Sequence, residues 1–316
     1  MVVRQVDGLE ALPLEHERTV VTVGFFDGVH LGHQAVLERT VAAARERGLP
    51  SVAITFDRHP REILTPGAEP RLLTTVERKA GLIAATGIDD LLVLPFTREF
   101  STWPPERFMT DVLREGLRAD HCVMGANFTF GHRARGNVEL LIAEGAAYGW
   151  SAERVELQDL DGRIVSSSSI RDALAAGDLE WPRRALGGRF VLDGTVVSGA
   201  GRGQGLGFPT ANLRTWPRLL LPGQGIYAGR AEVGEASHLA AIDVGTNPTF
   251  GTEPLHVESY LLDFDGDLVG QAMGVEFWAY LRPEVRFAGE AELVAAIDDD
   301  VRRTREIVRI PTDADR

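Results

Sequence analysis

Between residues 19 and 186, short apolar runs alternate with segments of helical length. The apolar runs resemble buried strands, and they are RTVVTVG (18–24), SVAITF (51–56), LLVLPF (91–96), HCVMG (121–125) and SAERVEL (151–157). The segments between them predict helices over 33–47, 75–86, 104–117 and 137–148. Alternation of this kind is typical of a parallel sheet with helices on its faces. We therefore predict an α/β domain over residues 1–186.

Residues that commonly begin or end helices support these boundaries. Gly48 is expected to end the first helix, and Pro104 with Pro105 is expected to start the third. Thr74 and Glu77 have the spacing of a capping box at the start of the second. In open sheets of this class, ligands bind beyond the carboxyl ends of the strands.

Beyond a helical stretch at 169–186 the pattern changes, because strand-like runs now follow one another with only Gly, Pro and Asn turns between them. The runs are FVLDGTVVSG (190–199), IYAGRAEV (226–233), HLAAIDVG (238–245), VESYLLDF (257–264) and GVEFWAYL (274–281). One closing helix is predicted over 291–308. We predict a second, mostly antiparallel domain over 187–316, a small β-barrel that is joined to the first domain at Gly187 and Gly188.

The composition limits the class of partner. The chain has 316 residues and a formal net charge of −13, which disfavours a general grip on nucleic acid or on an anionic membrane. The single cysteine, Cys122, excludes an internal disulfide framework, and its apolar setting predicts a buried position. Apolar stretches fall short of the roughly 18 residues of a membrane span. We predict a cytoplasmic protein with small-molecule partners.

The stretch FFDGVHLGHQ (25–34) places two imidazoles where a predicted strand meets a predicted helix. His30 and His33 are three residues apart, so they share one face of a helical turn. There they add phosphate donors to the partial positive charge of the helix N-terminus. We expect Asp27 to cap this helix and Gly28 to allow close backbone approach. The alternative is that both histidines are ordinary surface or capping residues.

The segment RIVSSSSIR (163–171) is a second candidate anion site. Ser166, Ser167 and Ser168 bring hydroxyls and backbone N–H groups to the start of the helical stretch. Arg163 and Arg171 can add charge-assisted hydrogen bonds to a phosphate. Taken alone, this segment would be an ordinary serine-rich helix cap.

In the second domain, SGAGRGQGLGFPTANL (198–213) carries glycines at every second position from 199 to 207, and we expect a loop that wraps closely around an anion. It is not a Walker A loop, because the only lysine of the chain is Lys79 and no GK[ST] sequence exists. Phosphate transfer here would therefore need Mg²⁺, held by oxygen ligands such as Thr210 and Asn212.

Glu258, in VESYLLDF, is a candidate general base, since a carboxylate can accept the proton of an attacking hydroxyl. The alternative is a polar position on an alternating strand. Among the other histidines, His59 could equally be a turn residue or a substrate contact, and His132 is expected in an exposed loop. We interpret the remaining ones that we considered as structural, namely His16, His121 and His238.

These motifs together resemble a known enzyme family. His30-Leu31-Gly32-His33 is similar to the HxGH signature of the nucleotidyltransferase superfamily, and GFFDGVHLGHQ (24–34) resembles the opening motif of the bacterial bifunctional riboflavin kinase/FAD synthetases. HPRE (59–62), GANFTFGHRARGN (125–137) and RIVSSSSIR match later segments of the same family. In the second domain, GFPTAN (207–212) resembles the PTAN motif of riboflavin kinases, and VESYLLDFDGDLVG (257–270) resembles their catalytic strand.

The resemblance implies a Rossmann-like nucleotidyltransferase domain, then a riboflavin kinase barrel with a C-terminal helix. The kinase would convert riboflavin and ATP to FMN, and the first domain would join FMN to AMP, giving FAD and pyrophosphate. In the first domain, the implied phosphate-binding residues are His30, His33, Asn127, Arg163, Ser166 and Ser167. In the second, the implied residues are Gly203, Gly205, Gly207 and Pro209 for ATP, Thr210 and Asn212 for the metal, and Glu258 as base.

Two residues depart from the family pattern. Ser168 stands where threonine is common, and Gln204 stands where many relatives carry arginine, which leaves Arg202 as the positive charge of that loop. Two other functions stay open on the sequence. One is a nucleotidyltransferase with a different acceptor, such as a pantetheine phosphate or a cytidylyl acceptor. The other is a flavin-binding or regulatory protein that lacks the chemistry.

Overall fold

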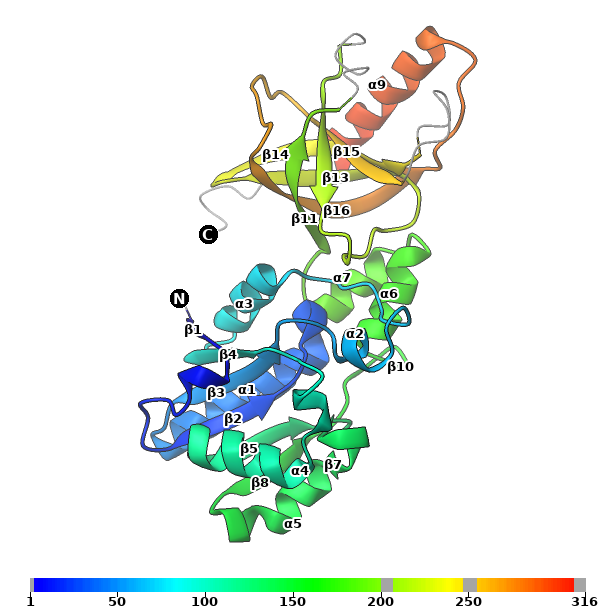
Figure 1. Cartoon of the computed structure of the whole chain (residues 1–316). Coiled ribbons are helices and arrows are strands. Elements are labelled where there is room, and N and C mark those ends of the chain that lie inside the picture. Colours follow the sequence, from blue (N-terminus) through cyan, green and yellow to red (C-terminus); the bar gives the residue numbers. More distant parts are fainter. Residues whose placement is uncertain (1–2, 200–206, 247–254, 310–316) are drawn as a thin grey trace. The chain divides into compact units, whose positions relative to one another are not determined.

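The computed structural model describes residues 3–199, 207–246 and 255–309 (Figure 1). The chain forms two compact units, Met1–Pro70 with Thr75–Ser167, and Arg71–Thr74 with Ser168–Arg316. The second unit thus includes a short piece of the first half of the sequence. The division into functional domains at residues 186 and 187 stays a prediction.

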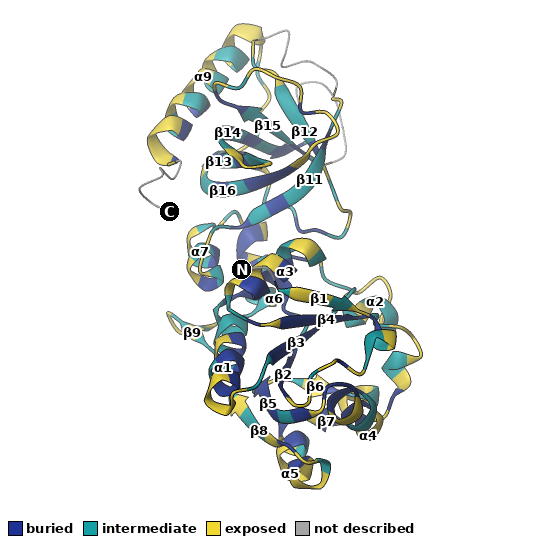
Figure 2. Ribbon diagram, turned by 90° about the vertical axis from the view of Figure 1, so that its left-hand side faces the viewer, coloured by how far each residue is buried: buried dark blue, intermediate teal, exposed yellow. Residues whose placement is uncertain are grey.

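The first unit is built on a six-stranded sheet in which all neighbouring strands are parallel. In spatial order the strands are β1 (Arg4–Asp7), β4 (Asp90–Leu94), β3 (Ser51–Phe56), β2 (Thr19–Val23), β5 (Ala119–Gly125) and β8 (Ser151–Val155). The central strands are buried on both faces, as Figure 2 shows by their colour. The parallel sheet predicted from the alternating pattern is therefore confirmed, whereas β1 was not predicted because it is short and mostly polar.

Helices cover both faces of this sheet. They are α1 (Leu31–Arg47), α2 (Pro60–Leu64), α3 (Val76–Ala85), α4 (Pro105–Arg107), the π-helix η4 (Phe108–Gly116) and α5 (Val138–Tyr148). Short 3-10 turns are η1 (Leu9–Ala11), η2 (Asp27–Val29), η3 (Phe100–Thr102) and η5 (His132–Ala134). Two-residue strands pair as β6 (Thr129–Phe130) with β7 (Gly136–Asn137), and β9 (Asp159–Leu160) with β10 (Arg163–Ile164).

The predicted helix ends are correct at two positions and wrong at a third. Gly48 ends α1 in the left-handed conformation, at φ 65°, and Pro105 begins α4. The residue that caps α3 is Thr75 rather than Thr74, because the Thr75 Oγ1 accepts the Arg78 N–H at 3.1 Å. Cys122 is fully buried in β5 as expected, and burial raises the pKa of its thiol to about 12.

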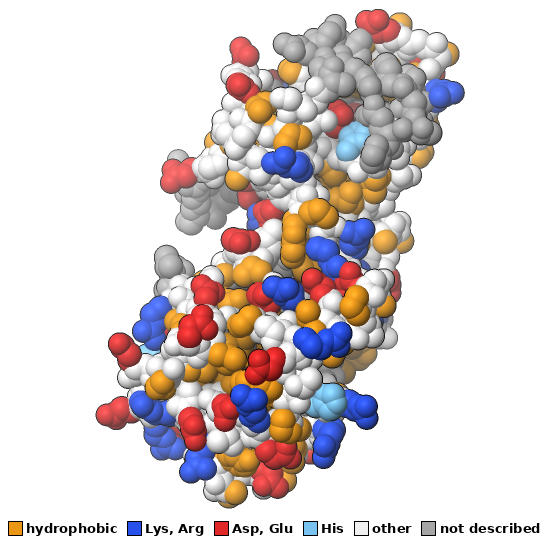
Figure 3. Space-filling model, in the orientation of Figure 1, with side chains coloured by type: hydrophobic (Ala, Val, Ile, Leu, Met, Phe, Trp, Pro, Cys, Tyr) orange, Lys and Arg blue, Asp and Glu red, His pale blue; other side chains and the backbone are white. Residues whose placement is uncertain are grey.

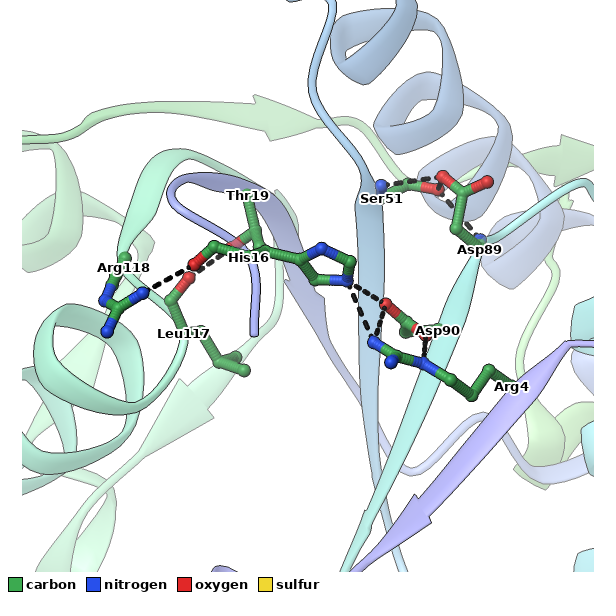
Figure 4. A network of polar contacts seen from close by, with 8 residues as sticks. All are labelled: Arg4, His16, Thr19, Ser51, Asp89, Asp90, Leu117 and Arg118. Carbon is green, nitrogen blue, oxygen red and sulfur yellow. Dashed lines mark hydrogen bonds and ion pairs between the residues drawn. The ribbon is translucent and has the colours of Figure 1, made fainter. Parts of the chain in front are cut away.

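A polar network ties the amino ends of the strands together (Figure 4). Asp90 lies buried at the start of β4 and binds both Arg4 of β1, through Nε at 2.5 Å, and His16. Asp89 accepts hydrogen bonds from the backbone N–H and the hydroxyl of Ser51 at 2.8 and 2.7 Å. This structural role of His16 leaves the opposite, carboxyl end of the sheet for ligands.

The second unit is a closed barrel with helices beside it. The barrel strands, in spatial order, are β11 (Val191–Val197), β12 (Thr210–Thr215), β15 (His256–Leu261), β14 (Ala236–Gly245), β13 (Gly225–Val233) and β16 (Ala272–Arg282). All neighbouring pairs are antiparallel, which confirms the predicted barrel. The helices are α6 (Ser167–Ala175), α7 (Glu180–Leu186) and α9 (Glu290–Ile307), and α9 packs against β13 and β14.

One expectation about the barrel is wrong. We predicted a loop over 198–213, but residues from Thr210 onward form β12, which pairs with β11 and β15. The glycines stop at Gly207, and the residues after Pro209 have side chains that a strand tolerates. Thr210 and Asn212 are therefore held on a barrel strand.

The segment Arg71–Thr74 belongs to this unit because it adds to the edge of residues 216–220. Leu72 is buried, donates its N–H to the Arg218 carbonyl at 2.7 Å, and accepts the Leu220 N–H at 2.8 Å. Inside the barrel, Gly229 allows β13 and β16 to approach closely, since a Cβ there would collide with the Glu276 carbonyl. Among the described residues, no helix is long and apolar enough to cross a membrane.

Candidate active sites

The first candidate site lies where the strand order of the sheet reverses. From β2 the chain proceeds to β3 and β4 on one side, and to β5 and β8 on the other. The carboxyl ends of β2 and β5 therefore form the topological switch point, which is where ligands bind in open α/β sheets. FFDGVHLGHQ follows β2, and Asn127 follows β5 as an exposed residue. The fold thus brings together two motifs that are about a hundred residues apart in the sequence.

The turn between β2 and α1 is tightly constrained. Phe26 and Val29 have positive φ angles of 54° and 41°, which side chains with a Cβ seldom adopt, and Gly28 has a φ of 79°. Asp27, Gly28 and His30 are buried. Strained backbone of this kind persists only where the surroundings hold it, and such positions cluster at ligand-binding sites.

His30, not Asp27, caps the helix that follows. Its Nδ1 accepts the His33 N–H at 3.4 Å, while Asp27 lies in the preceding 3-10 turn, so the expected capping role of Asp27 is wrong. The His30 and His33 rings stack with their centroids 3.6 Å apart. A Cβ at position 32 would lie 3.2 Å from the His30 ring. Glycine at this position therefore avoids a close contact with that ring.

One ring nitrogen of His33 has unused hydrogen-bonding capacity. Burial first, then the neighbouring His30 and Lys79, hold the pKa of His33 well below its usual 6.5. Its Nδ1 is buried, and none of the described residues forms a hydrogen bond with that atom. Buried polar atoms normally have partners, so an unpartnered one at a switch point is typical of a group that binds a ligand.

The serine segment contacts this turn directly. The Ser167 hydroxyl donates to the Asp27 carbonyl at 3.0 Å, so Ser167 lies against η2 within the first unit. Ser166 and Arg163 are partly buried just before it, Arg163 on the short strand β10. Within the second unit, the Arg171 guanidinium donates to the Ser168 hydroxyl at 3.4 Å. The roles of these residues in binding phosphate stay predictions.

The other histidines have clear structural contacts. His59 caps α2, where its Nδ1 accepts the Arg61 N–H at 3.1 Å, and its ring meets Phe25 edge-on at 4.9 Å. His132 is only partly exposed, with its Nδ1 3.2 Å from the Ser101 carbonyl, so the expected exposed loop position is wrong. His121 contacts Ser151 at 2.7 Å, and His238 packs against Phe264.

The second candidate site is a polar row across three strands of the barrel. Glu258 on β15 is the cross-strand partner of Asn212 on β12 and of Asp243 on β14. The Thr210 hydroxyl donates to Glu258 Oε2 at 2.8 Å, and the His256 Nε2 lies 3.3 Å from Glu258 Oε1. The two sequence motifs, PTAN and VESYLL, are therefore joined into one site by strand pairing.

The glycine-rich segment before β12 borders this row. A Cβ at Gly199 would collide with the Asn212 amide, so this glycine allows the close approach. Gly207 has a φ of 85°, and Pro209 is exposed. Gly203, Gly205, Arg202 and Gln204 lie outside the described residues.

Two families of known proteins match the two halves of the chain. The FAD synthetase family matches residues 12–169, and the riboflavin kinase family matches residues 186–308. The chain is 37% identical over 303 residues to the bifunctional riboflavin kinase/FMN adenylyltransferase of Pseudomonas fluorescens, with 96% of this chain and 97% of the relative covered. It is 35% identical to the protein of that name from Listeria monocytogenes, with 90% and 91% covered.

The chain belongs to the bifunctional riboflavin kinase/FMN adenylyltransferase family. A relative of that name from Escherichia coli K12 is 33% identical, with 96% of each chain covered. Among solved structures, one from Streptococcus pneumoniae covers 98% of this chain and all of its own, with a TM-score of 0.85 and 26% identity. That protein is named a macrolide-efflux protein. The likeness shows that the complete two-part architecture recurs in a protein of low sequence identity.

Sequence reasoning missed a group of phenylalanines near the carboxyl ends of the strands of the first unit. Phe56 ends β3 and Phe96 follows β4. The Phe100 ring is tilted against Phe56, with ring centroids 5.9 Å apart, and it meets Phe96 edge-on at 5.6 Å. Phe128 follows β5 and stacks on Phe130 at 5.6 Å. Phe56, Phe96, Phe100 and Phe128 are all partly exposed. The available signal was that Phe56, Phe96 and Phe128 lie at or shortly after the ends of predicted strands. In the view of Figure 3, hydrophobic side chains of this unit reach the surface among interspersed acidic and basic ones.

The polar row of the barrel offers the kind of oxygen ligands that Mg²⁺ prefers. Thr210 and Asn212 supply a hydroxyl and an amide oxygen beside the Glu258 carboxylate, and all three are partly exposed. No group of three or more His, Cys, Asp or Glu side chains in the described residues could hold a metal ion.

Asp243 is a further residue of the polar row of the barrel, and sequence reasoning did not select it as a site residue. Burial, then the nearby Glu284 and Glu258 carboxylates, raise the pKa of Asp243 to about 7, and no described residue forms a hydrogen bond with its Oδ1. The folded chain therefore binds this proton more tightly than the unfolded chain does. As the pH rises from about 4 to about 7, the folded state loses stability relative to the unfolded state.

We expect Asp243→Asn to remove this loss, because an amide of similar size carries no charge. The free energy of unfolding of the barrel at pH 8 should increase by about 1–3 kcal/mol, with little change at pH 4. Urea unfolding of both proteins at the two pH values, followed by tryptophan fluorescence, measures the difference. Equal pH dependence in both proteins would show that the Asp243 carboxyl titrates normally.

Proposed function

We infer that this protein makes flavin cofactors at two separate active sites. The barrel phosphorylates riboflavin with ATP to give FMN, and the α/β unit transfers AMP from ATP to FMN to give FAD and pyrophosphate. The observation that carries this inference is the joint presence of two complete constellations. One is the stacked histidine pair at the switch point, and the other is the Thr210–Glu258 pair beside Asn212 in the barrel.

In the kinase reaction, Glu258 acts as the general base. It accepts the proton of the ribityl 5′-hydroxyl while that oxygen attacks the γ-phosphorus of ATP, and ADP leaves. The Thr210 hydroxyl fixes the orientation of the carboxylate by its 2.8 Å hydrogen bond. Thr210 and Asn212 would hold Mg²⁺, which supplies charge neutralisation at the phosphates when it is bound. Gly203, Gly205, Gly207 and Pro209 are proposed to follow the ATP phosphates.

In the adenylyltransferase reaction, a phosphate oxygen of FMN attacks the α-phosphorus of ATP and the bond to pyrophosphate breaks. No side chain needs to act as a nucleophile, so positioning and charge stabilisation supply the catalysis. His30, His33 and the N-terminus of α1 are proposed to bind the ATP phosphates. Asn127, Asp27 and Gly28 border this site, and Arg163, Ser166, Ser167, Ser168 and Arg171 are proposed to bind the triphosphate.

The partly exposed phenylalanines offer a place for the flavin ring. Phe56 ends β3, and Phe96 and Phe128 follow β4 and β5, so these residues lie at the same edge of the sheet as the histidine pair. Flat aromatic ligands pack favourably against the edges and faces of phenylalanine rings. We propose that the isoalloxazine ring of FMN packs there while its phosphate points toward the switch point. We also propose a cytoplasmic location, on the grounds of composition.

A chromatographic time course tests the function. The purified chain is incubated with riboflavin and Mg·ATP, and riboflavin, FMN, FAD and pyrophosphate are measured together. We expect FMN to appear first and FAD to follow with an equal amount of pyrophosphate. Parallel reactions without Mg²⁺, and with 4′-phosphopantetheine in place of FMN, serve as controls. Pyrophosphate release with phosphopantetheine but not with FMN would show that the acceptor is wrong.

A further inference from the structure

The only lysine of the chain is buried beside the adenylyltransferase turn. Lys79 lies on α3 and is 3% exposed. Its ammonium donates to the Phe25 carbonyl at 3.1 Å, to the Thr55 hydroxyl at 2.9 Å and to the Phe56 carbonyl at 3.2 Å. It also lies 4.4 Å from the centre of the Phe25 ring. The three ammonium protons thus have three acceptors.

These acceptors belong to two segments that bear candidate site residues. Phe25 begins the strained turn that leads to His30, and Phe56 ends the strand that leads to His59. The Thr55 hydroxyl also donates to the Phe25 carbonyl, at 3.0 Å, so the two segments are joined both directly and through the ammonium. Any movement of Lys79 would therefore shift the turn that places the histidine pair.

Joining two segments through a buried ammonium costs more free energy than joining them through a neutral side chain. Removing a charge from water costs much free energy, and a neutral side chain of similar shape often packs as well or better. The acidic groups near Lys79 are Asp27 in η2 and Asp57 after β3, and His33 in α1 is the nearby titratable base. Burial outweighs the two carboxylates and lowers the pKa of Lys79 to about 8. The ammonium thus lies at a site that destabilises its charged form, and side chains with such shifted pKa values are common at functional sites.

The charge of Lys79 acts electrostatically on the site where anions are proposed to bind. It is one of the causes that lower the pKa of His33, so its field acts on that ring. A neutral His33 gives hydrogen bonds but no net charge to an ATP phosphate. A nearby fixed cation in a poorly hydrated site interacts with developing negative charge far more strongly than one in water.

We propose that Lys79 is a positioning residue of the adenylyltransferase site. Its buried ammonium holds the turn from Phe25 to His30 against the end of β3, and it supplies positive charge behind the neutral His33 ring. This inference rests on the proposed function of that site. It assigns Lys79 an effect on the ATP reaction of the α/β unit and none on the kinase reaction of the barrel.

The wild-type enzyme gives the first test, which needs no variant to fold. We measure the pH dependence of kcat/KM for ATP in FAD synthesis from supplied FMN, between pH 6.5 and pH 9.5. As the pH rises through the pKa of Lys79, the ammonium loses its charge and kcat/KM should fall about tenfold for each pH unit. The fall should be weaker in kcat, because bound ATP favours the charged form. A flat profile over this range would overturn the proposal.

Lys79→Met gives the second test, since methionine fills similar space without charge. We expect kcat/KM for ATP in FAD synthesis to fall about 10²-fold at pH 7. The decrease of kcat/KM at high pH seen in the wild type should be absent, and the rate of riboflavin phosphorylation should be unchanged. Ile83→Ala is the matched control, because Ile83 is fully buried on the same helix and contacts the same core. If Ile83→Ala reduces FAD synthesis as much as Lys79→Met does, the effect is only loss of packing and the proposal fails.

The failure of this inference is distinguishable from failure of the proposed function. If the wild-type chain makes FAD but Lys79→Met keeps full kcat/KM, the function stands and the role of Lys79 is wrong. If the wild-type chain makes no FAD from FMN and ATP under any condition, the proposed function itself is wrong, and Lys79 has no reaction to position.

Discussion

Replacing His30 by asparagine or His33 by alanine should stop FAD synthesis at the FMN stage. Each change removes an imidazole from the stacked pair at the helix N-terminus. Loss of one donor to a transferring phosphate typically lowers the rate by about 10²–10³-fold, so the double variant should lose at least about 10³-fold. Riboflavin phosphorylation should stay within about twofold of the wild type. The chromatographic time course then ends at FMN.

The choice of asparagine at position 30 separates two roles of His30. Its Nδ1 caps α1, and asparagine is among the best residues at an N-cap, so the helix should persist. Asparagine is too short to place a donor where the imidazole reaches. His132→Ala is the control, since His132 contacts the Ser101 carbonyl in a different loop. If His30→Asn makes FAD at the wild-type rate, His30 is a helix cap and has no part in the reaction.

Glu258→Gln should abolish riboflavin phosphorylation and leave the adenylyltransferase intact. The substitution keeps the size of the side chain and the acceptor for the Thr210 hydroxyl, but it removes the basic carboxylate. Loss of a general base lowers the rate by about 10²–10⁴-fold. With riboflavin and Mg·ATP the variant should make neither FMN nor FAD, whereas with supplied FMN it should make FAD at the wild-type rate. Both products are measured in the same assay.

Glu232→Gln is the matched control for this variant. Glu232 lies on the barrel strand β13 and pairs with Arg230, away from the row that joins Asn212, Glu258 and Asp243. It should keep both activities. Full riboflavin kinase activity in Glu258→Gln would mean that another group accepts the proton, and Asp243 would then be the first residue to examine, since it lies directly across from Glu258.

The fold and the function could be predicted from the sequence because the local apolar patterns and the short motifs indicate the same two domains. Alternating runs predicted the parallel sheet, and consecutive runs predicted the barrel, since the period of apolar residues reflects which face of an element is buried. The motifs HLGH and PTAN, each contained in a few residues, pointed to both reactions. The family comparisons confirm this fold and this function.

Other features could not be predicted because they depend on contacts between distant segments. The capping residue of α1 is His30 rather than Asp27, since the strained turn from Phe26 to Val29 delays the helix. Thr210 and Asn212 lie on a strand because β11 and β15 flank them, a pairing that composition alone does not reveal. The sequence favoured a loop because its glycines dominate the local pattern.

The sequence by itself determined the two folds and their order, and it suggested candidate residues for the chemistry. Only the tertiary structure decided which of these residues meet. Strand order puts His33 and Asn127 at one switch point, and strand pairing puts Asn212, Glu258 and Asp243 in one row. It also buried Lys79 against the Thr55 hydroxyl, where its charge acts on His33. Burial and electric fields arise from the packing of distant segments, so no local pattern carries them.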